Sequence, residues 1–258
     1  MKAPVQLSLD MPCQRWRNGR ASYRPAGELF DPRYITVEAI DDSMAKAYVL
    51  RHHYSGSYPA ARFRAGVFRK EPWRKEELVG VGVFSVPMNQ QVIPAYFDGL
   101  APNDGAELGR FVLAESLAAN AESWAIARMK RLLRQHLPSV RGIVAYCDPV
   151  ERRTVDGTLI KRGHTGVIYK ASGCTYRGRS SARTLWLAPN GESLADRTLS
   201  KIRLEEVGQG YAMDKLRQIG APPARFNESG VSYIERLKTS GWLRPLRHPG
   251  NFAFTFSL

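Results

Sequence analysis

The chain has 258 residues, which is enough for one large domain or for one domain with an elaboration. No apolar run approaches the roughly 20 residues that span a bilayer, no signal peptide is visible, and Cys13, Cys147 and Cys174 are too few and too scattered for a disulfide framework or a cysteine-only zinc site. The formal net charge of +14 and the isoelectric point near 10.0 favour a polyanionic partner. We therefore expect a cytoplasmic protein that binds nucleic acid, and not a membrane protein.

The positive charge is distributed unevenly along the chain. Through Val150 the sequence has 20 basic and 15 acidic residues, and from Glu151 onward it has 18 basic and 9 acidic residues. We expect nucleic acid to contact the second part, with an anionic membrane surface as the competing polyanion, although no basic amphipathic helix stands out. Three regions are predicted: an irregular basic arm at 1–33, an acyltransferase-like core at 34–187, and a basic helical extension with a closing strand at 188–258.

The core opens with a strand at 34–40 and a helix that Asp41 can cap. A polar, turn-rich loop follows this helix and holds two of the five histidines beside two tyrosines. Histidine titrates near neutrality and can act as a base, as a ligand, or as a surface on which a nucleobase stacks. The alternative is a loop whose histidines only hydrogen-bond the backbone. The candidate residues of this loop are Arg51, His52, His53 and Tyr54.

Residues 107–113 are predicted to form a strand of the core. In a regular strand, Leu108, Arg110 and Val112 would share one face. A helix follows, with Asn120 as its predicted N-cap.

The junction between this strand and this helix is a candidate site. Glu107 and Arg110 would lie near the helix N-terminus, with Asn120 and Ser123 in its first turn. A helix N-terminus favours anions because its backbone N–H groups are unpaired. The alternative is a strand edge with a structural Glu–Arg pair.

A second candidate site follows the apolar run at 142–147, which predicts a buried strand ending at Asp148. Ligands of open sheets bind at the carboxyl ends of strands, so Asp148 is a candidate functional carboxylate. The alternative is a turn, since Asp-Pro often starts one. A short helix ending at Gly173 comes next and carries Tyr169, with His164 just before it.

The order of elements up to residue 187 predicts an α+β fold, with a mixed sheet of acyltransferase type and helices on both faces. Residues 183–187 are expected to complete a hairpin around Gly178, and 151–162 to form a charged loop. The helical pattern at 200–219 is broken at two glycines, and the aromatic strand at 252–256 is expected to lie at a sheet edge.

Two resemblances support this order. The sequence Ile-Tyr-Lys-Ala-Ser-Gly at 168–173 looks like the last-helix signature of the GCN5-related N-acetyltransferase fold, in which a tyrosine often protonates the leaving group. More specifically, the chain resembles the Mom family of phage DNA-modification proteins. The pieces that carry this resemblance recur in the expected order, at 51–55, 78–87, 107–113, 120–124, 146–149, 164–171 and 176–179.

The Mom resemblance implies an activity. The family converts adenine in DNA to its carbamoylmethyl form at the exocyclic amine, which shields phage DNA from restriction enzymes. It also implies a phage- or prophage-encoded protein that acts in the bacterial host. The partner is then double-stranded DNA, whose target base must leave the duplex to be modified.

The chemistry suggests a role for each candidate residue. Adenine's amine is a poor nucleophile because its lone pair is delocalised into the ring, so it needs a base, and the oxyanion needs stabilisation. Asp148 is the candidate base, or the residue that holds the amine, and Tyr169 is the candidate acid for the leaving group. His53 and Tyr54 are expected to stack on the extruded base or to position it. Residues expected at the donor are Arg110, Ser123, Glu107, Asn120 and His164. Residues expected to contact DNA are Arg51, His52, Arg177, Arg179, Lys201, Arg203, Lys215 and Arg217.

The acyl donor stays open between acetyl-CoA and an aminoacyl donor such as glycyl-tRNA, which would make tRNA a second partner. Acetyltransferases hold the coenzyme A pyrophosphate with a glycine-rich loop. The corresponding residues here, 114–119, contain no glycine and include Glu115, which argues against coenzyme A.

Three rival functions remain. One is a coenzyme A-dependent acetyltransferase that acts on a protein or a small amine. Another is a non-catalytic DNA-binding protein on an acyltransferase scaffold. The third places iron or another metal on His52, His53, Tyr54 and Asp148, although adjacent histidines rarely point into one coordination sphere; we therefore predict no metal site.

Overall fold

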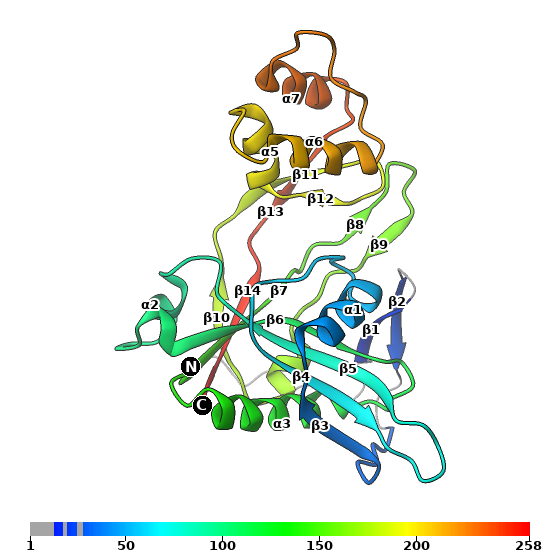
Figure 1. Cartoon of the computed structure of the whole chain (residues 1–258), viewed down its shortest axis with the longest axis vertical. Coiled ribbons are helices and arrows are strands. Elements are labelled where there is room, and N and C mark those ends of the chain that lie inside the picture. Colours follow the sequence, from blue (N-terminus) through cyan, green and yellow to red (C-terminus); the bar gives the residue numbers. More distant parts are fainter. Residues whose placement is uncertain (1–12, 18–19, 25–27) are drawn as a thin grey trace, which may run out of the picture. The chain divides into compact units, whose positions relative to one another are not determined.

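The computed structural model describes residues 13–17, 20–24 and 28–258, which divide into two compact units (Figure 1). Unit 1 contains the described residues up to Pro149, together with His164–Arg179 and Asn251–Leu258, and unit 2 contains Val150–Gly163 and Ser180–Gly250. None of the helices in these described ranges has both the length and the apolar character needed to cross a membrane.

Unit 1 is built on a seven-stranded sheet in the order β10-β14-β7-β6-β5-β4-β3. Only β6 and β7 are parallel, and every other neighbouring pair is antiparallel. The mixed α+β fold predicted from the sequence is confirmed. The strands of this sheet are β3 (Ile35–Ala39), β4 (Ala61–Arg69), β5 (Glu77–Ser85), β6 (Gly105–Leu113), β7 (Gly142–Cys147), β10 (Thr175–Arg179) and β14 (Phe252–Ser257).

The helices of unit 1 cover both faces of its sheet. The helix α1 (Asp42–His52) packs with the face that carries Val81 and Val83. The helix α3 (Ala121–His136) packs with the opposite face, where Gly82 leaves room for Met129: a Cβ added at Gly82 would lie 2.4 Å from the Met129 sulfur. Glycine is therefore required for α3 to approach this closely.

The shorter elements of unit 1 connect these layers. They are α2 (Val92–Tyr96), the 3₁₀ turn η1 (Pro102–Asp104) and α4 (Val167–Ala171), and a separate antiparallel hairpin is formed by β1 (Cys13–Arg17) and β2 (Arg20–Arg24). The prediction of an irregular arm at 1–33 therefore misses this hairpin. The cap predicted for α1 is confirmed, because the Asp41 carboxylate accepts from the Met44 backbone N–H at 2.8 Å.

The parallel strands β6 and β7 separate partway along their length. They pair at Gly105↔Gly142, Ala106↔Ile143 and Glu107↔Val144, after which β6 continues beside β5 and β7 continues beside β14. The ladder between the two strands therefore ends at Glu107 and Val144, and we call the place where their carboxyl halves are no longer paired the sheet opening.

A bulge in β6 turns the strand at this opening. The register with β5 shifts at this point, because Val83 pairs with Arg110 whereas Phe84 pairs with Leu108. Leu108 consequently packs in the core cluster on the α3 face, while Val112 packs in the cluster on the α1 face. The prediction that Leu108, Arg110 and Val112 share one face is wrong, because a bulge inserts one extra residue and reverses the alternation.

Unit 2 has its own core and its own small sheets. A three-stranded sheet has the order β12-β11-β13, and β8 and β9 pair as a hairpin. Three helices bury apolar side chains such as Ile202, Leu216 and Leu237. The elements are β8 (Arg152–Arg153), β9 (Leu159–Lys161), β11 (Arg183–Leu187), β12 (Ser193–Leu194), β13 (Arg244–His248), α5 (Asp196–Arg203), α6 (Gln209–Gln218) and α7 (Gly230–Thr239).

The structure divides the chain differently from the predicted ranges. The expected hairpin around Gly178 does not form, because β10 pairs with β14 while β11 pairs with β12 and β13. The C-terminal strand β14 lies between β10 and β7 and is not an edge. Residues 151–162, expected as a loop, contain β8 and β9.

Candidate functional site

The opening between β6 and β7 begins at Glu107, and Arg110 follows the bulge. The Arg110 guanidinium donates from Nε to the Ser57 carbonyl at 2.9 Å, from Nη2 to the Ser57 hydroxyl at 2.8 Å, and from Nη1 to the Gly109 carbonyl. Burial lowers the pKa of Arg110, and the charges of Tyr54, Glu107 and Tyr169 oppose that change. Burial raises the pKa of Glu107, and this rise is opposed by the charge of Arg110 and by the hydrogen bond from the Met88 N–H. The expected Glu–Arg corner is thus anchored by the Ser57 loop.

The loop after α1 supplies His53 and Tyr54, whose rings stack with centroids 4.4 Å apart. The Ser55 backbone N–H donates to His53 Nδ1 at 3.1 Å, so the neutral ring carries its proton on Nε2. Burial lowers the pKa of His53 to about 3, and the charges of Arg110 and His164 act in the same direction. His53 is therefore neutral at pH 7 and offers a hydrogen-bond donor.

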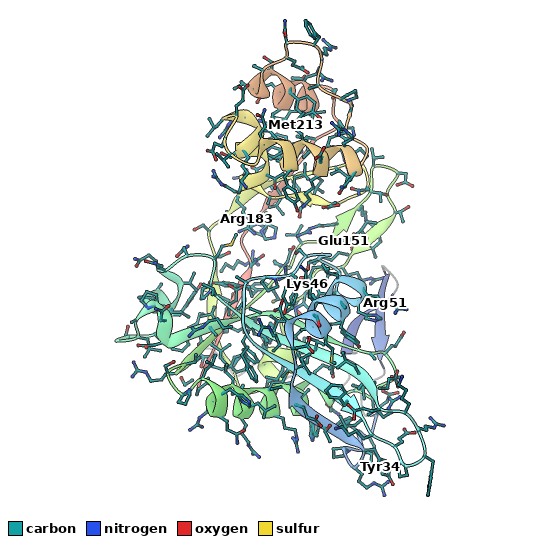
Figure 2. All side chains as sticks on the ribbon, viewed as in Figure 1. Tyr34, Lys46, Arg51, Glu151, Arg183 and Met213 are labelled. Carbon is teal, nitrogen blue, oxygen red and sulfur yellow. The ribbon has the colours of Figure 1, made fainter. Side chains whose placement is uncertain are left out.

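The neighbouring candidates at the end of α1 have different surroundings. The His52 ring packs against Tyr48 with centroids 4.5 Å apart, and Arg51 lies on the exposed end of the helix (Figure 2). The two adjacent histidines thus contact different partners. Within the described ranges, no group of three or more His, Cys, Asp or Glu side chains is arranged to hold a metal ion.

Tyr169 lies on α4 and is buried in the main core. Its ring contacts His164 at 6.0 Å and Phe254 at 5.4 Å between centroids. Burial raises the pKa of the Tyr169 phenol well above its usual range, and the charges of Cys147, Tyr54 and Glu107 add to the effect. No described residue shares a hydrogen bond with its hydroxyl. The phenol keeps its proton at neutral pH and is available to a bound molecule.

Asp148 follows β7 directly and is 8% exposed. Its backbone carbonyl accepts from the His164 N–H at 2.8 Å, and the Gly166 N–H donates to His164 Nδ1 at 3.3 Å. The backbone of Asp148 and the ring of Tyr169 are therefore linked through His164.

Ser123 and Asn120 do not build the anion corner expected at α3. Asn120 has a left-handed backbone (φ 73°) and makes no side-chain cap, while the Ser123 hydroxyl donates to the Asn120 carbonyl at 3.2 Å. Asn120 is the N-cap residue of α3, as predicted, but its side chain makes no capping hydrogen bond.

An internal carboxylate occupies the corner instead. The Ala119 N–H, just before α3, donates to Glu28 Oε2 at 3.0 Å. Arg69 Nη2 donates to the Ser116 carbonyl and hydroxyl at 3.2 and 3.1 Å, which fixes the same loop. A glycine-free loop whose N–H already binds a carboxylate does not fit the pyrophosphate of coenzyme A.

The residues expected to contact DNA fall into several environments. Arg177 donates to the Thr255 hydroxyl and to the Tyr96 carbonyl, and Arg179 stacks over Phe252. Lys215 pairs with Glu192 at 3.6 Å, and Arg217 pairs with Asp214 at 2.9 Å. The remaining two, Lys201 and Arg203, lie on α5.

The positive charge is not concentrated in unit 2. By sequence, unit 1 has 23 basic and 15 acidic residues, and unit 2 has 15 basic and 9 acidic residues. The nucleic-acid interface therefore cannot be assigned to unit 2 on charge alone.

Sequence reasoning missed Ser57 and Glu28. The sequence Ser55-Gly56-Ser57, which follows the histidines after Tyr54, was a signal for Ser57, because serines in a tight turn present both hydroxyl and carbonyl groups. Nothing in the sequence pointed to the contact between Glu28 and Ala119, which are 91 positions apart.

Comparison with known proteins gives one family. Residues 34–227 match the model of the Mom protein family. A tandem GNAT protein from the clavulanic acid biosynthesis pathway, in a structure without AcCoA, is similar with a TM-score of 0.40 and 11% sequence identity over 86% of this chain and 98% of that chain. No curated protein matches the chain.

Proposed function

Because the chain belongs to the Mom protein family, we propose that it is a transferase that converts adenine in DNA to its carbamoylmethyl form and thereby protects phage DNA from restriction. The observation that carries the proposal is the sheet opening, beside which Ser57 anchors the Arg110 guanidinium. Arg110 lies close enough to His53 to lower the pKa of that ring, and close enough to Tyr169 for the phenol to affect the pKa of Arg110. These groups donate hydrogen bonds, and Glu107 and Asp148 supply carboxylates. Acyl transfer to a weak amine needs both kinds of group.

Adenine would enter this opening as an extruded base. The stacked rings of His53 and Tyr54 offer a flat surface for it, and the His53 Nε2–H can donate to a ring nitrogen. Asp148 takes the proton that the amine loses as it attacks. The neutral state of His53 matters here, because a cation at this position would repel Arg110 and His164.

Tyr169 suits one kind of leaving group better than another. A phenol whose pKa is raised by burial is a weak acid, so it transfers its proton only to a strong base. The alkoxide that leaves a ribose ester is a strong base and takes a proton from such a phenol readily, whereas a thiolate, with a pKa of about 8.5, is a weaker base and leaves with less need of a proton. The phenol is therefore compatible with an oxygen ester as donor.

The product is consistent with a glycyl ester donor, such as glycyl-tRNA. Adenine's amine attacks the glycyl carbonyl, the ester C–O bond breaks, and the ribose oxygen leaves with the proton of Tyr169. The amine of the attached glycine then bonds to the ring carbon that bears the amide nitrogen, and the bond from that carbon to the amide nitrogen breaks. The carbamoylmethyl product is an isomer of the glycyl intermediate, so no oxidant is required. Acetyl transfer would need an added oxidation.

The proposal is tested by mass spectrometry of nucleosides from the DNA of cells that express the chain. Wild-type protein should yield carbamoylmethyl-deoxyadenosine, and Asp148→Asn should yield none while still binding DNA. A digest from wild-type-expressing cells that contains no modified adenine would reject the proposed activity. Full modification by the Asp148→Asn variant would reject Asp148 as the base.

A further inference from the structure

The solvent-facing side of α3 is strongly basic. It carries Arg128, Lys130, Arg131 and Arg134, and the helix sequence contains a single acid, Glu122, which is buried. Across residues 28–258, the structure gives no ion pair to any of these four cations. A hollow of about 490 Å³ beside the helix is lined by Lys130, Arg131, Arg134, Ser257 and three other residues.

This basic surface continues onto α4. Lys130 of α3 and Lys170 of α4 both act on the Cys174 thiol, because the charges of both lysines lower its pKa against the larger effect of burial. Lys170 directly follows Tyr169 along the chain. We call Arg128, Lys130, Arg131, Arg134 and Lys170 the α3 ridge, which thus reaches the helix that carries the phenol of the proposed site.

The side chains of the ridge are held in place by packing. The Arg128 guanidinium lies 3.7 Å from the centre of the Trp124 ring, and the Lys130 ammonium lies 4.7 Å from the centre of the Phe256 ring. Burial lowers the pKa of Arg128, and the charge of Arg131 lowers it further. Like charges at this spacing destabilise a helix slightly. A cationic surface kept at this cost is expected to meet an anion.

Several basic residues of unit 2 differ in this respect. On and beside its helices, Arg197, Lys215, Arg217, Arg236 and Lys238 each pair with a nearby carboxylate, whereas the structure gives no ion pair within the described residues to Lys201 and Arg203 of α5. Paired cations release fewer counterions when they meet a phosphate, so they contribute less to binding.

We propose that the α3 ridge binds the sugar–phosphate backbone of the duplex DNA substrate. The inference rests on the proposed function for the choice of DNA as the polyanion. From Arg128 to Arg134 the helix rises about 9 Å, which matches two to three phosphates at 3.4 Å of duplex axis each. Contacts of this kind position the duplex without reading its sequence, and base selection is left to the opening between β6 and β7.

The test is the salt dependence of binding to a labelled duplex, measured by fluorescence anisotropy. Lys130→Ala/Arg131→Ala/Arg134→Ala should reduce the slope of log affinity against log salt by about 3, roughly one for each phosphate contact. The matched control, Arg33→Ala/Arg74→Ala, removes two exposed cations that already pair with Asp31 and Glu71, so it should change the slope little. Arg131→Glu/Arg134→Glu is a second variant, because these two side chains are exposed and stack on no ring, so folding should be unaffected.

The outcomes separate this inference from the proposed function. The inference would be overturned if both ridge variants kept the wild-type salt slope, or if the wild-type protein did not bind the duplex. It would also be overturned if the ridge variants lost affinity only for structured RNA. Ridge variants that still modify DNA normally would reject the ridge and leave the activity standing. Salt-dependent binding through the ridge without any modified adenine would reject the activity and leave the ridge standing.

Discussion

Replacing Tyr169 with phenylalanine removes one hydroxyl and leaves the ring packed against Phe254. If the phenol protonates the leaving group, the rate of modification should fall by about 10²- to 10⁴-fold, the usual contribution of a general acid. Stability should not fall, because no described residue hydrogen-bonds this hydroxyl. The free energy of unfolding of Tyr169→Phe should therefore stay close to the wild-type value.

The matched control is Tyr233→Phe in unit 2. Tyr233 is also buried, but its hydroxyl donates to the Pro222 carbonyl at 2.9 Å. Its loss should lower the free energy of unfolding by about 1 kcal/mol and leave modification intact. Modification would be measured by nucleoside mass spectrometry and stability by urea unfolding. If the Tyr169→Phe variant modified DNA at the wild-type rate, the assignment of this phenol as the acid would be refuted.

Three further predictions follow. The His53 ring should show no titration between pH 5 and 8 by NMR, because its pKa is lowered to about 3. Since the ring in the unfolded chain binds a proton below about pH 6.5, this residue should make the protein less stable as the pH falls from 6.5 towards 3. A titration midpoint near 6.5 in the folded protein would contradict the burial of His53. Gly82→Ala should lower the free energy of unfolding by about 1–3 kcal/mol, because its methyl group would overpack against Met129. The control Gly210→Ala, on open helix surface, should leave the free energy of unfolding unchanged or raise it by up to about 1 kcal/mol. Equal unfolding midpoints for the two variants would count against the close contact between α3 and the sheet. Acetyl-CoA should not bind in a calorimetric titration, because the Ala119 N–H is taken by Glu28; micromolar binding would show that the loop at 114–119 opens.

The sequence predicted the core layers well, because each layer follows from local patterns. The Asp41 cap, the apolar run at 142–147 and the aromatic strand near the C-terminus were all visible as patterns. Strand pairing was less predictable. The neighbours of β11 and β14 depend on contacts between distant segments, and proximity along the chain wrongly favoured a hairpin between β10 and β11.

The candidate site was predicted in part. Chemistry proposed His53, Arg110 and Tyr169, and the structure places Arg110 close enough to His53 to affect the pKa of that ring and close enough to Tyr169 for the phenol to affect the pKa of Arg110. The β6 bulge, which reverses the alternation after Leu108, could not be read from the strand itself. It places Gly109 where an added Cβ would lie 2.4 Å from the Ser85 hydroxyl oxygen. The left-handed Asn120 likewise depends on a loop held from outside by Glu28 and Arg69.

The central claim is that adenine in DNA receives a glycine-derived group. Cells that express the chain would be fed glycine labelled with ¹⁵N and ¹³C, and the modified nucleoside would be compared with unmodified deoxyadenosine from the same digest, because label in the purine ring raises both masses equally. We predict a carbamoylmethyl group that carries both glycine carbons, with the glycine nitrogen on the purine ring and an unlabelled terminal amide. An unlabelled group, or DNA without modified adenine, would contradict the account.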